Sequence, residues 1–296
     1  MASSPSASAS PAPGEASGSG HRPTCLLTVD VEDWRDAHLA GGTAADGPAS
    51  DLERPLSLLL DLLAAHRARA TFFVLGRLAR HHPDLIRRLG RDHEVATHGQ
   101  THTDLRRLDP ARLRAEIRDS RHLLEDVTGR PIGGYRAPNW SLGAVLPWGA
   151  EVIAAEGLAY DSSLIPGRGL WFLPGARVPR GPHRLAGTAV WEFPPTVVDL
   201  GFASAPAAGG AFLRLLPTAA ILAILDGARA RGERPHLHVH PWEVGPAAPA
   251  AGAAGRRQRL LRAGAGGVAA KLAAILGHWQ SMAISDDCWR VAERAA

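Results

Sequence analysis

The chain has few cysteines and no long apolar run, and each absence narrows the kind of protein it can be. Of 296 residues only two are cysteine, Cys25 and Cys288. Their spacing gives no support for a disulfide, so we interpret them as two buried, unreactive thiols. Because no run of about 18 apolar residues occurs, we expect no transmembrane helix.

A strong excess of one charge is also missing. The chain has 33 Lys and Arg residues against 29 Asp and Glu residues, and a net charge of +4 is too small and too scattered to indicate a nucleic-acid partner. Residues 1–22 are rich in Ser, Ala, Pro and Gly and lack the basic and apolar regions of a secretory signal. We therefore expect a disordered tail and, by default, a cytoplasmic protein.

The remainder of the chain predicts one large domain over residues 23–290. Hydrophobic residues make up 45% of the chain, which is enough for a sizeable core. Strand-like and helix-like segments alternate, and this alternation predicts an α/β fold with a mostly parallel sheet, open or closed into a barrel. We expect strands over 25–31, 70–75, 93–97, 134–136, 158–160, 190–193, 236–240 and 280–284, helices over 51–65, 77–89, 110–127, 146–156, 212–231 and 256–276, and long loops over 165–189 and 245–255.

Polar side chains gather where several of these strands end. In parallel sheets functional groups lie at the carboxyl ends of the strands, so these side chains are candidates for one site. They are Asp30, Glu32, Asp33, His98, His102, Arg136, Asp161 and His240.

Two histidines at this edge have the spacing of a metal-binding pair. His98 and His102 are four residues apart and follow a short apolar strand, so on a helical turn both imidazoles would share one face and one metal ion. Alone, such a pair is more often a solvated helix face. Together with carboxylates at the end of the first strand, it predicts an open metal site with a general base beside it, which indicates hydrolysis.

Five motifs in this order resemble those of the polysaccharide deacetylase family, which includes chitin and peptidoglycan N-deacetylases. The resemblance runs from about residue 24 to residue 290. The motifs are Thr28–Asp33, His98–His102, Arg136–Pro138, Tyr160–Ser163 and Leu237–His240. The strings Asp30–Trp34, Gly209–Pro217 and His240–Glu243 are most similar to a subgroup associated with exopolysaccharide and exosortase gene clusters.

The resemblance implies an irregular (β/α) barrel with roughly seven parallel strands, including a region specific to the subgroup over about 190–290. It implies a metal-dependent hydrolase that removes N-acetyl groups from N-acetylhexosamine units of a polysaccharide or its precursor. The substrate would be an N-acetylated oligo- or polysaccharide, and the cofactor a divalent metal, with zinc the first choice.

The resemblance also implies a role for each motif residue. His98 and His102 would be metal ligands, and Asp30 would be the general base. Arg136 would hold Asp30 ionised and oriented. Because the chain is rich in arginine, Arg136 could instead be an ordinary surface residue.

The proton donor to the leaving amine is assigned in the same way. His240 would be this acid, with Asp161 tuning it, although Asp161 could merely form a turn. By strand alternation His238 shares a face with His240 and is a rival for the acid role. The backbone N–H of Asn139 is a candidate donor to the oxyanion.

Two carboxylates, Glu32 and Asp33, are candidates for the third metal ligand. The family motif has adjacent aspartates, but here Val31 separates Asp30 from Glu32. On a strand, residues i and i+2 point the same way, which favours Glu32. If the strand ends at Val31, Asp33 could turn inward instead.

Three tryptophans lie beside the motifs and indicate a saccharide groove. Aromatic faces suit the apolar faces of sugar rings, so Trp34, Trp140 and Trp242 are candidate substrate contacts. For Trp242, packing in the core is an equal alternative. Two other functions remain to be distinguished: a non-catalytic carbohydrate-binding protein, and another C–N hydrolase of the same fold that acts on small cyclic amides.

Overall fold

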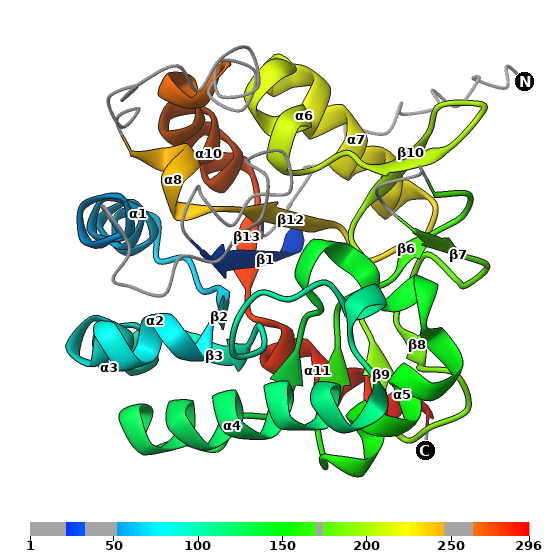
Figure 1. The fold of residues 1–296 in the computed structure, drawn as a ribbon. Coiled ribbons are helices and arrows are strands. Elements are labelled where there is room, and N and C mark those ends of the chain that lie inside the picture. The colour runs from blue at the N-terminus through cyan, green and yellow to red at the C-terminus, as the bar shows by residue number, and fades with distance from the viewer. Residues whose placement is uncertain (1–21, 33–51, 170–173, 246–262, 296) are drawn as a thin grey trace, which may run out of the picture.

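The computed structural model describes residues 22–32, 52–169, 174–245 and 263–295 (Figure 1). The expected tail over 1–21, Asp33, Trp34 and most of the segment 245–262 lie outside these residues. Among the helices described, none is both long enough and apolar enough to span a membrane.

The core of the fold is a curled, mostly parallel sheet. Its strand order is β12-β1-β2-β3-β4-β5-β9-β8, and β13 also pairs with β1. From β12 to β9 every neighbouring pair is parallel, and only β8 is antiparallel. The strands are β1 (Thr24–Val31), β2 (Thr71–Val74), β3 (Glu94–Thr97), β4 (Gly134–Tyr135), β5 (Tyr160–Asp161), β8 (His183–Arg184), β9 (Trp191–Glu192), β12 (His236–Val239) and β13 (Gln280–Met282).

The two ends of this sheet approach each other without forming a full ladder. The chain leaving β9 reaches β12, where the Thr196 N–H donates to the His236 carbonyl oxygen over 3.4 Å and the His236 N–H donates to Thr196 Oγ over 2.8 Å. The sheet is therefore a half-barrel with an irregular seam. This confirms the predicted irregular barrel and its roughly seven parallel strands.

Helices pack around the outer side of the curled sheet, and in the view of Figure 1 α2, α3 and α4 lie below it and α6, α7 and α10 above it. Alternate side chains of β1 pack against these helices or, like Leu26, in a second apolar cluster on the inner side. Because both faces are covered, β1 is buried along nearly its whole length, as its apolar sequence requires. The helices are α1 (Glu53–Ala65), α2 (Gly76–His81), α3 (Pro83–Asp92), α4 (Pro110–Thr128), α5 (Leu146–Ala155), α6 (Gly210–Leu215), α7 (Thr218–Ala230), α8 (Pro241–Val244), α10 (Val268–His278) and α11 (Ile284–Ala295).

Capping residues determine both ends of α4, the helix whose bounds were predicted best. Asp109 accepts the Arg112 N–H over 2.8 Å at the start of α4, Pro110 occupies its first turn, and Gly129 ends it at φ 66°. Pro83 does not interrupt a single helix. It starts α3 after the chain has left helical geometry at His82.

Two expectations need correction. The segment 165–189, expected to be a loop, contains β8 and the paired strands β6 (Ile165–Pro166) and β7 (Gly175–Ala176). The last strand ends at Met282 rather than residue 284, because Asp286 accepts the Ala283 N–H and α11 begins at Ile284. A hairpin of β10 (Val197–Asp199) and β11 (Ser204–Pro206) follows β9.

Candidate active site

The predicted site residues come together at the carboxyl ends of the strands. Asp30 is at the end of β1, and His98, Arg136 and His240 are the first residues after β3, β4 and β12. Asp161 ends β5. The parallel sheet thus places five separate sequence motifs at one edge.

Glu32, His98 and His102 form a compact group of potential metal ligands. One ligand atom from each residue lies within 4.8 Å of the others. Glu32 Oε2 is 2.7 Å from His102 Nε2 and 3.8 Å from His98 Nε2. Burial alone opposes ionisation of Glu32, but His102 and His240 beside it hold its pKa well below the usual value.

The donor set of this group fits a divalent metal such as zinc. Two imidazoles and one carboxylate are three protein ligands, which leaves a coordination position open for chemistry. The backbone carbonyl of Arg136 lies 2.8 Å from His98 Nδ1, so this nitrogen carries the proton and Nε2 faces Glu32. Asp33, the alternative ligand, lies outside the described residues.

The two histidines share this group through a loop and not through the expected helical turn. Gly99 at φ 81° and His102 at φ 63° break helical geometry. Glu116 of α4 holds the loop instead: its Oε2 accepts the N–H groups of Gln100 and Thr101 over 2.7 and 2.8 Å. No sequence motif indicated this role for Glu116.

Asp30 and Arg136 form a buried ion pair beside this group. Arg136 Nη1 donates to Asp30 Oδ1 over 2.7 Å. Burial favours the neutral form of Asp30, but the charges of Arg136 and His98 outweigh it and lower the pKa of the carboxyl. Asp30 is therefore ionised and oriented near the potential metal ligands.

Arg136 is not a surface arginine. It is fully buried, and its guanidinium lies between the rings of Phe73 and Trp140, 4.2 and 4.5 Å from their centroids. Its Nε donates to the Ser162 carbonyl and its Nη2 to Ser162 Oγ, over 2.8 and 2.7 Å. These contacts fix the guanidinium in one orientation toward Asp30.

The two rival histidines differ in charge. Burial lowers the pKa of His238 to about 4, so it is neutral. For His240 burial acts the same way, but Glu243 and Glu32 outweigh it and raise its pKa to about 9. His240 Nδ1 is 2.9 Å from Glu243 Oε2 and its Nε2 is 3.4 Å from Glu32 Oε1. Nε2 of His240 therefore faces the potential metal ligands.

Within the described part of the chain, no hydrogen bond joins Asp161 to His240. Its Oδ1 accepts Ser163 Oγ–H over 2.7 Å, and it pairs in register with Glu192 across β5 and β9. The carboxylate in contact with His240 is Glu243. By its position, Glu243 is therefore the carboxylate that can tune His240, the role that the sequence analysis predicted for Asp161.

Asn139 and Trp140 form a strained turn after Arg136. Both have left-handed backbone geometry, at φ 54° and 55°, which is unusual for a tryptophan. The Trp140 ring meets His238 edge-on at 5.3 Å. The turn thus sets the Asn139 backbone and an aromatic side chain beside the ion pair.

Trp242 and Gly209 shape the other wall. The Trp242 ring stacks on His240 at 5.2 Å, and Arg214 lies over its ring, also at 5.2 Å. Gly209 bridges to His238, and a Cβ at this glycine would lie 2.2 Å from His238 Nδ1. The close approach of the two segments explains the glycine in the string Gly209–Pro217.

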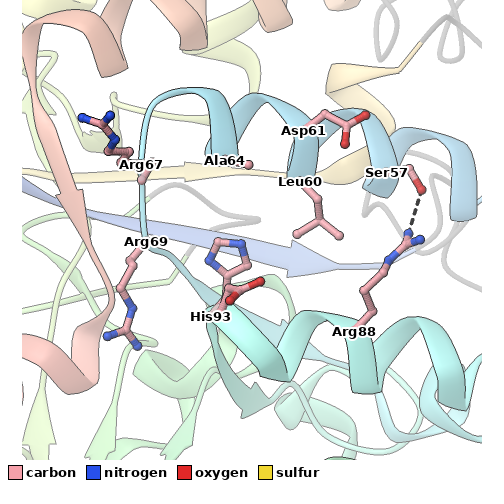
Figure 2. Close-up of a pocket in the computed structure, with 10 residues that line it drawn as sticks. Ser57, Leu60, Asp61, Ala64, Arg67, Arg69, Arg88 and His93 are labelled. Carbon is pink, nitrogen blue, oxygen red and sulfur yellow. Dashed lines mark hydrogen bonds between the residues drawn. The ribbon is translucent and has the colours of Figure 1, made fainter.

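A cavity of about 480 Å³ lies between α1 and α3, away from the candidate site (Figure 2). Its lining includes Arg67, Arg69, Arg88 and His93. Arg88 bonds Ser57, whereas the guanidinium groups of Arg67 and Arg69 point away from the cavity. These cations do not converge on one ligand, so the cavity does not compete with the carboxyl-end site.

Comparison with known families agrees with this geometry. Residues 43–151 match the polysaccharide deacetylase family, and residues 162–286 match a family described as a domain of unknown function (DUF3473). Over residues 43–151 the chain is similar to the polysaccharide deacetylase family. His98, His102 and Arg136 fall in this segment and His240 in the second, so the candidate site draws on both matched segments.

Individual relatives point the same way. The chain is 48% identical over 133 residues to a chitooligosaccharide deacetylase of Bradyrhizobium sp. (strain ANU 289), covering 44% of this chain and 55% of that protein. It is 48% identical over 63 residues to a chitooligosaccharide deacetylase of Rhizobium leguminosarum bv. trifolii, covering 21% and 29%. The chain thus spans about half or less of these relatives.

One solved structure shows the same fold. A Mycobacterium smegmatis protein assigned as a polysaccharide deacetylase superposes with a TM-score of 0.62 at 23% identity, covering 97% of this chain and 96% of the other. At this identity the likeness concerns the fold alone.

Proposed function

We propose that this protein is a metal-dependent N-deacetylase that releases acetate from N-acetylhexosamine units of an oligo- or polysaccharide or its precursor. The observation that carries the proposal is the grouping of Glu32, His98 and His102 next to the ion pair of Asp30 and Arg136. The match of residues 43–151 to the polysaccharide deacetylase family and the similarity to chitooligosaccharide deacetylases support the reaction class. An exopolysaccharide precursor in the cytoplasm is the substrate we favour.

In the proposed reaction each site residue has a separate role in amide hydrolysis. A divalent metal, zinc by preference, would supply Lewis acidity that polarises the acetyl carbonyl. Asp30 would take the proton of the attacking water, and Arg136 keeps this carboxylate ionised between proton transfers. The positive charge of Arg136 is held by packing, so it needs no reorganisation during the reaction.

The leaving amine needs a proton, and His240 is placed to give it. Glu243 bonds Nδ1, which leaves Nε2 directed at the potential ligands. His238 is held neutral by burial and is the weaker candidate. The Asn139 N–H, fixed by the left-handed turn, would donate to the developing oxyanion.

Metal content and acetate release test the proposal together. Wild type is expected to bind about one metal ion per chain and His102→Ala to bind much less, as measured by elemental mass spectrometry. His122→Ala is the matched control, because His122 is exposed on α4. Wild type should also release acetate from an N-acetylated chitooligosaccharide.

The same assays separate the alternatives. A wild type without metal after reconstitution with zinc would overturn the proposal and favour a binding protein. Metal binding with turnover of small cyclic amides, but not of acetylated saccharides, would favour another C–N hydrolase. Fractionation of the source cells tests the proposed location.

A further inference from the structure

Two carboxyl groups beside the site have no assigned role. Asp161 ends β5 and Glu192 ends β9, and their Cα atoms are in register across the parallel pair. Both residues are fully buried. One oxygen of each receives hydrogen bonds: Asp161 Oδ1 accepts from Ser163 Oγ, and Glu192 Oε1 accepts the N–H groups of Ser163 and Leu164 over 3.2 and 2.9 Å.

The second oxygen of each carboxyl group lacks a hydrogen-bond donor. Asp161 Oδ2 and Glu192 Oε2 are buried and receive no N–H or O–H from any described group. The side chains of Asp161 and Glu192 lie within hydrogen-bonding reach of each other. Two negative charges this close and away from water repel strongly, and the nearby cation, Arg136, is already paired with Asp30. A single proton between these oxygens removes one charge and satisfies both atoms.

The surrounding charges agree with a shared proton. Burial, together with the charge of Asp161, raises the pKa of Glu192 well above the ordinary value. Burial also raises the pKa of Asp161. On the neighbouring strand β8, His183 is in register with Glu192, but burial lowers the pKa of His183 and its Nδ1 bonds the Gly181 carbonyl. His183 is therefore no cation that could replace the proton.

The pair connects to the active site through Ser163. Since Ser163 Oγ donates to Asp161, its lone pair can accept the Ala137 N–H, which lies 2.8 Å away. Ala137 follows Arg136 and precedes the left-handed turn at Asn139 and Trp140. A chain of hydrogen bonds therefore runs from Glu192 to the segment that carries the guanidinium and the candidate oxyanion donor.

We propose that Asp161 and Glu192 share one proton and act as positioning residues for the segment Arg136–Trp140. Glu192 donates its proton to Asp161, which fixes Ser163 and through it the Ala137 backbone. The neutral form of Glu192 also leaves Asp30 as the direct carboxylate partner of Arg136. The part of this proposal that concerns turnover rests on the proposed deacetylase function.

Infrared spectroscopy tests the shared proton without reference to activity. The difference spectrum of wild type minus Glu192→Gln, recorded at about pH 8 on the full chain, should show the C=O band of a protonated carboxyl group. The glutamine keeps an acceptor for Ser163 and Leu164 and an N–H donor for Asp161. Absence of the band would overturn the shared proton, even if no substrate had been found.

Kinetics test the positioning role. Glu192→Gln should keep kcat within about threefold, whereas Glu192→Ala and Ser163→Ala should lower kcat by about tenfold or more with little change in KM. Glu94→Gln, at a half-buried carboxyl at the other end of β3, is the control and should keep wild-type kcat. Wild-type kcat in Ser163→Ala, or a loss in Glu192→Gln equal to that in Glu192→Ala, would overturn the positioning role.

Discussion

Asp30 is the single residue on which the proposed chemistry depends most directly. Asp30→Asn keeps the size of the side chain and an oxygen that can accept from Arg136, but it removes the base. We expect kcat for acetate release to fall by about 10²–10⁴, with metal content unchanged. Activity within about threefold of wild type, measured alongside metal analysis, would remove Asp30 from the base role.

Glu94 provides a pH-dependent prediction away from the site. It accepts from Thr71 Oγ, Tyr160 OH and the Ser285 N–H over 2.6, 2.8 and 2.9 Å, yet burial raises its pKa above the ordinary 4.5. A raised folded-state pKa means that the folded protein holds this proton more tightly than the unfolded chain does. The contribution to stability is therefore complete at low pH and is lost as pH rises through the folded-state pKa.

Glu94→Gln removes this titration. Urea unfolding at a series of pH values from about 4 to 8 should show wild type losing stability relative to Glu94→Gln as pH rises. Arg87→Gln, on the surface of α3, is a control that leaves the buried carboxyl intact. A difference between wild type and Glu94→Gln that does not change with pH would contradict the assignment.

Sequence motifs identified the site residues that lie at the ends of recognisable strands. They missed residues whose role depends on which strands are neighbours in the folded sheet. Asp30, His98 and Arg136 each follow or end a recognisable apolar strand. Glu192 was not predicted, because its partner Asp161 is 31 residues away and β6, β7 and β8 intervene before β9. Glu116 was missed because its partners, the backbone N–H groups of Gln100 and Thr101 and the Thr101 hydroxyl, form no motif with a residue 15 positions away.

At the scale of elements, a lysine holds the end of α6. Lys271, the only lysine in an arginine-rich chain, donates from Nζ to the carbonyl oxygens of Leu213, Arg214 and Leu216 over 3.1, 2.8 and 2.8 Å. A compact ammonium can point three N–H groups at three carbonyls, whereas a planar guanidinium cannot. The element so fixed carries Arg214, which bonds Glu243 Oε1 over 2.7 Å.

Lys271→Met is therefore expected to destabilise the protein. The methionine fills the same space but leaves the last carbonyls of α6 without donors, at a cost of about 1–3 kcal/mol in unfolding free energy. Lys271→Arg should recover only part of this loss, because of its geometry. Urea unfolding measures both, and equal stability of wild type and Lys271→Met would show that the three bonds are replaced by water.

Elements with complete local signals were predicted well, and those held by distant partners were not. Helix α4 has a cap at each end and appears where expected. The short strands β6, β7 and β8 have two residues each, so no alternation of polar and apolar residues can reveal them. Their existence depends on partners that only the folded sheet supplies.

For the molecule as a whole, β1 is the strand that joins the two halves of the sequence. Along one edge it pairs with β12, and along the other it pairs first with β13 and then with β2, so that Leu26 lies between His236 and Met282. The family match over 43–151 therefore does not correspond to an independent folding unit. A fragment of residues 22–160 would lack β12, which covers one edge of β1, and β13, which covers the start of the other edge.

We expect that fragment not to fold alone. Without β12, β13 and α10, the apolar side chains around β1 and its unpaired edge are exposed to water. Circular dichroism during urea titration should show no cooperative transition for the fragment, and metal binding should be lost. Addition of residues 161–295 should restore both, whereas a cooperative transition in the fragment alone would contradict this account.

The pairing of β1 with β12 also has a consequence during synthesis on the ribosome. The register joins residues about 210 positions apart, and at roughly 5–20 residues per second the second strand follows the first after some tens of seconds at the lower rate. Throughout this delay a strand built for two buried faces has one edge without its neighbour. Nascent chains of this protein are therefore expected to depend on chaperones that shield their earliest segment until the last quarter of the chain has emerged.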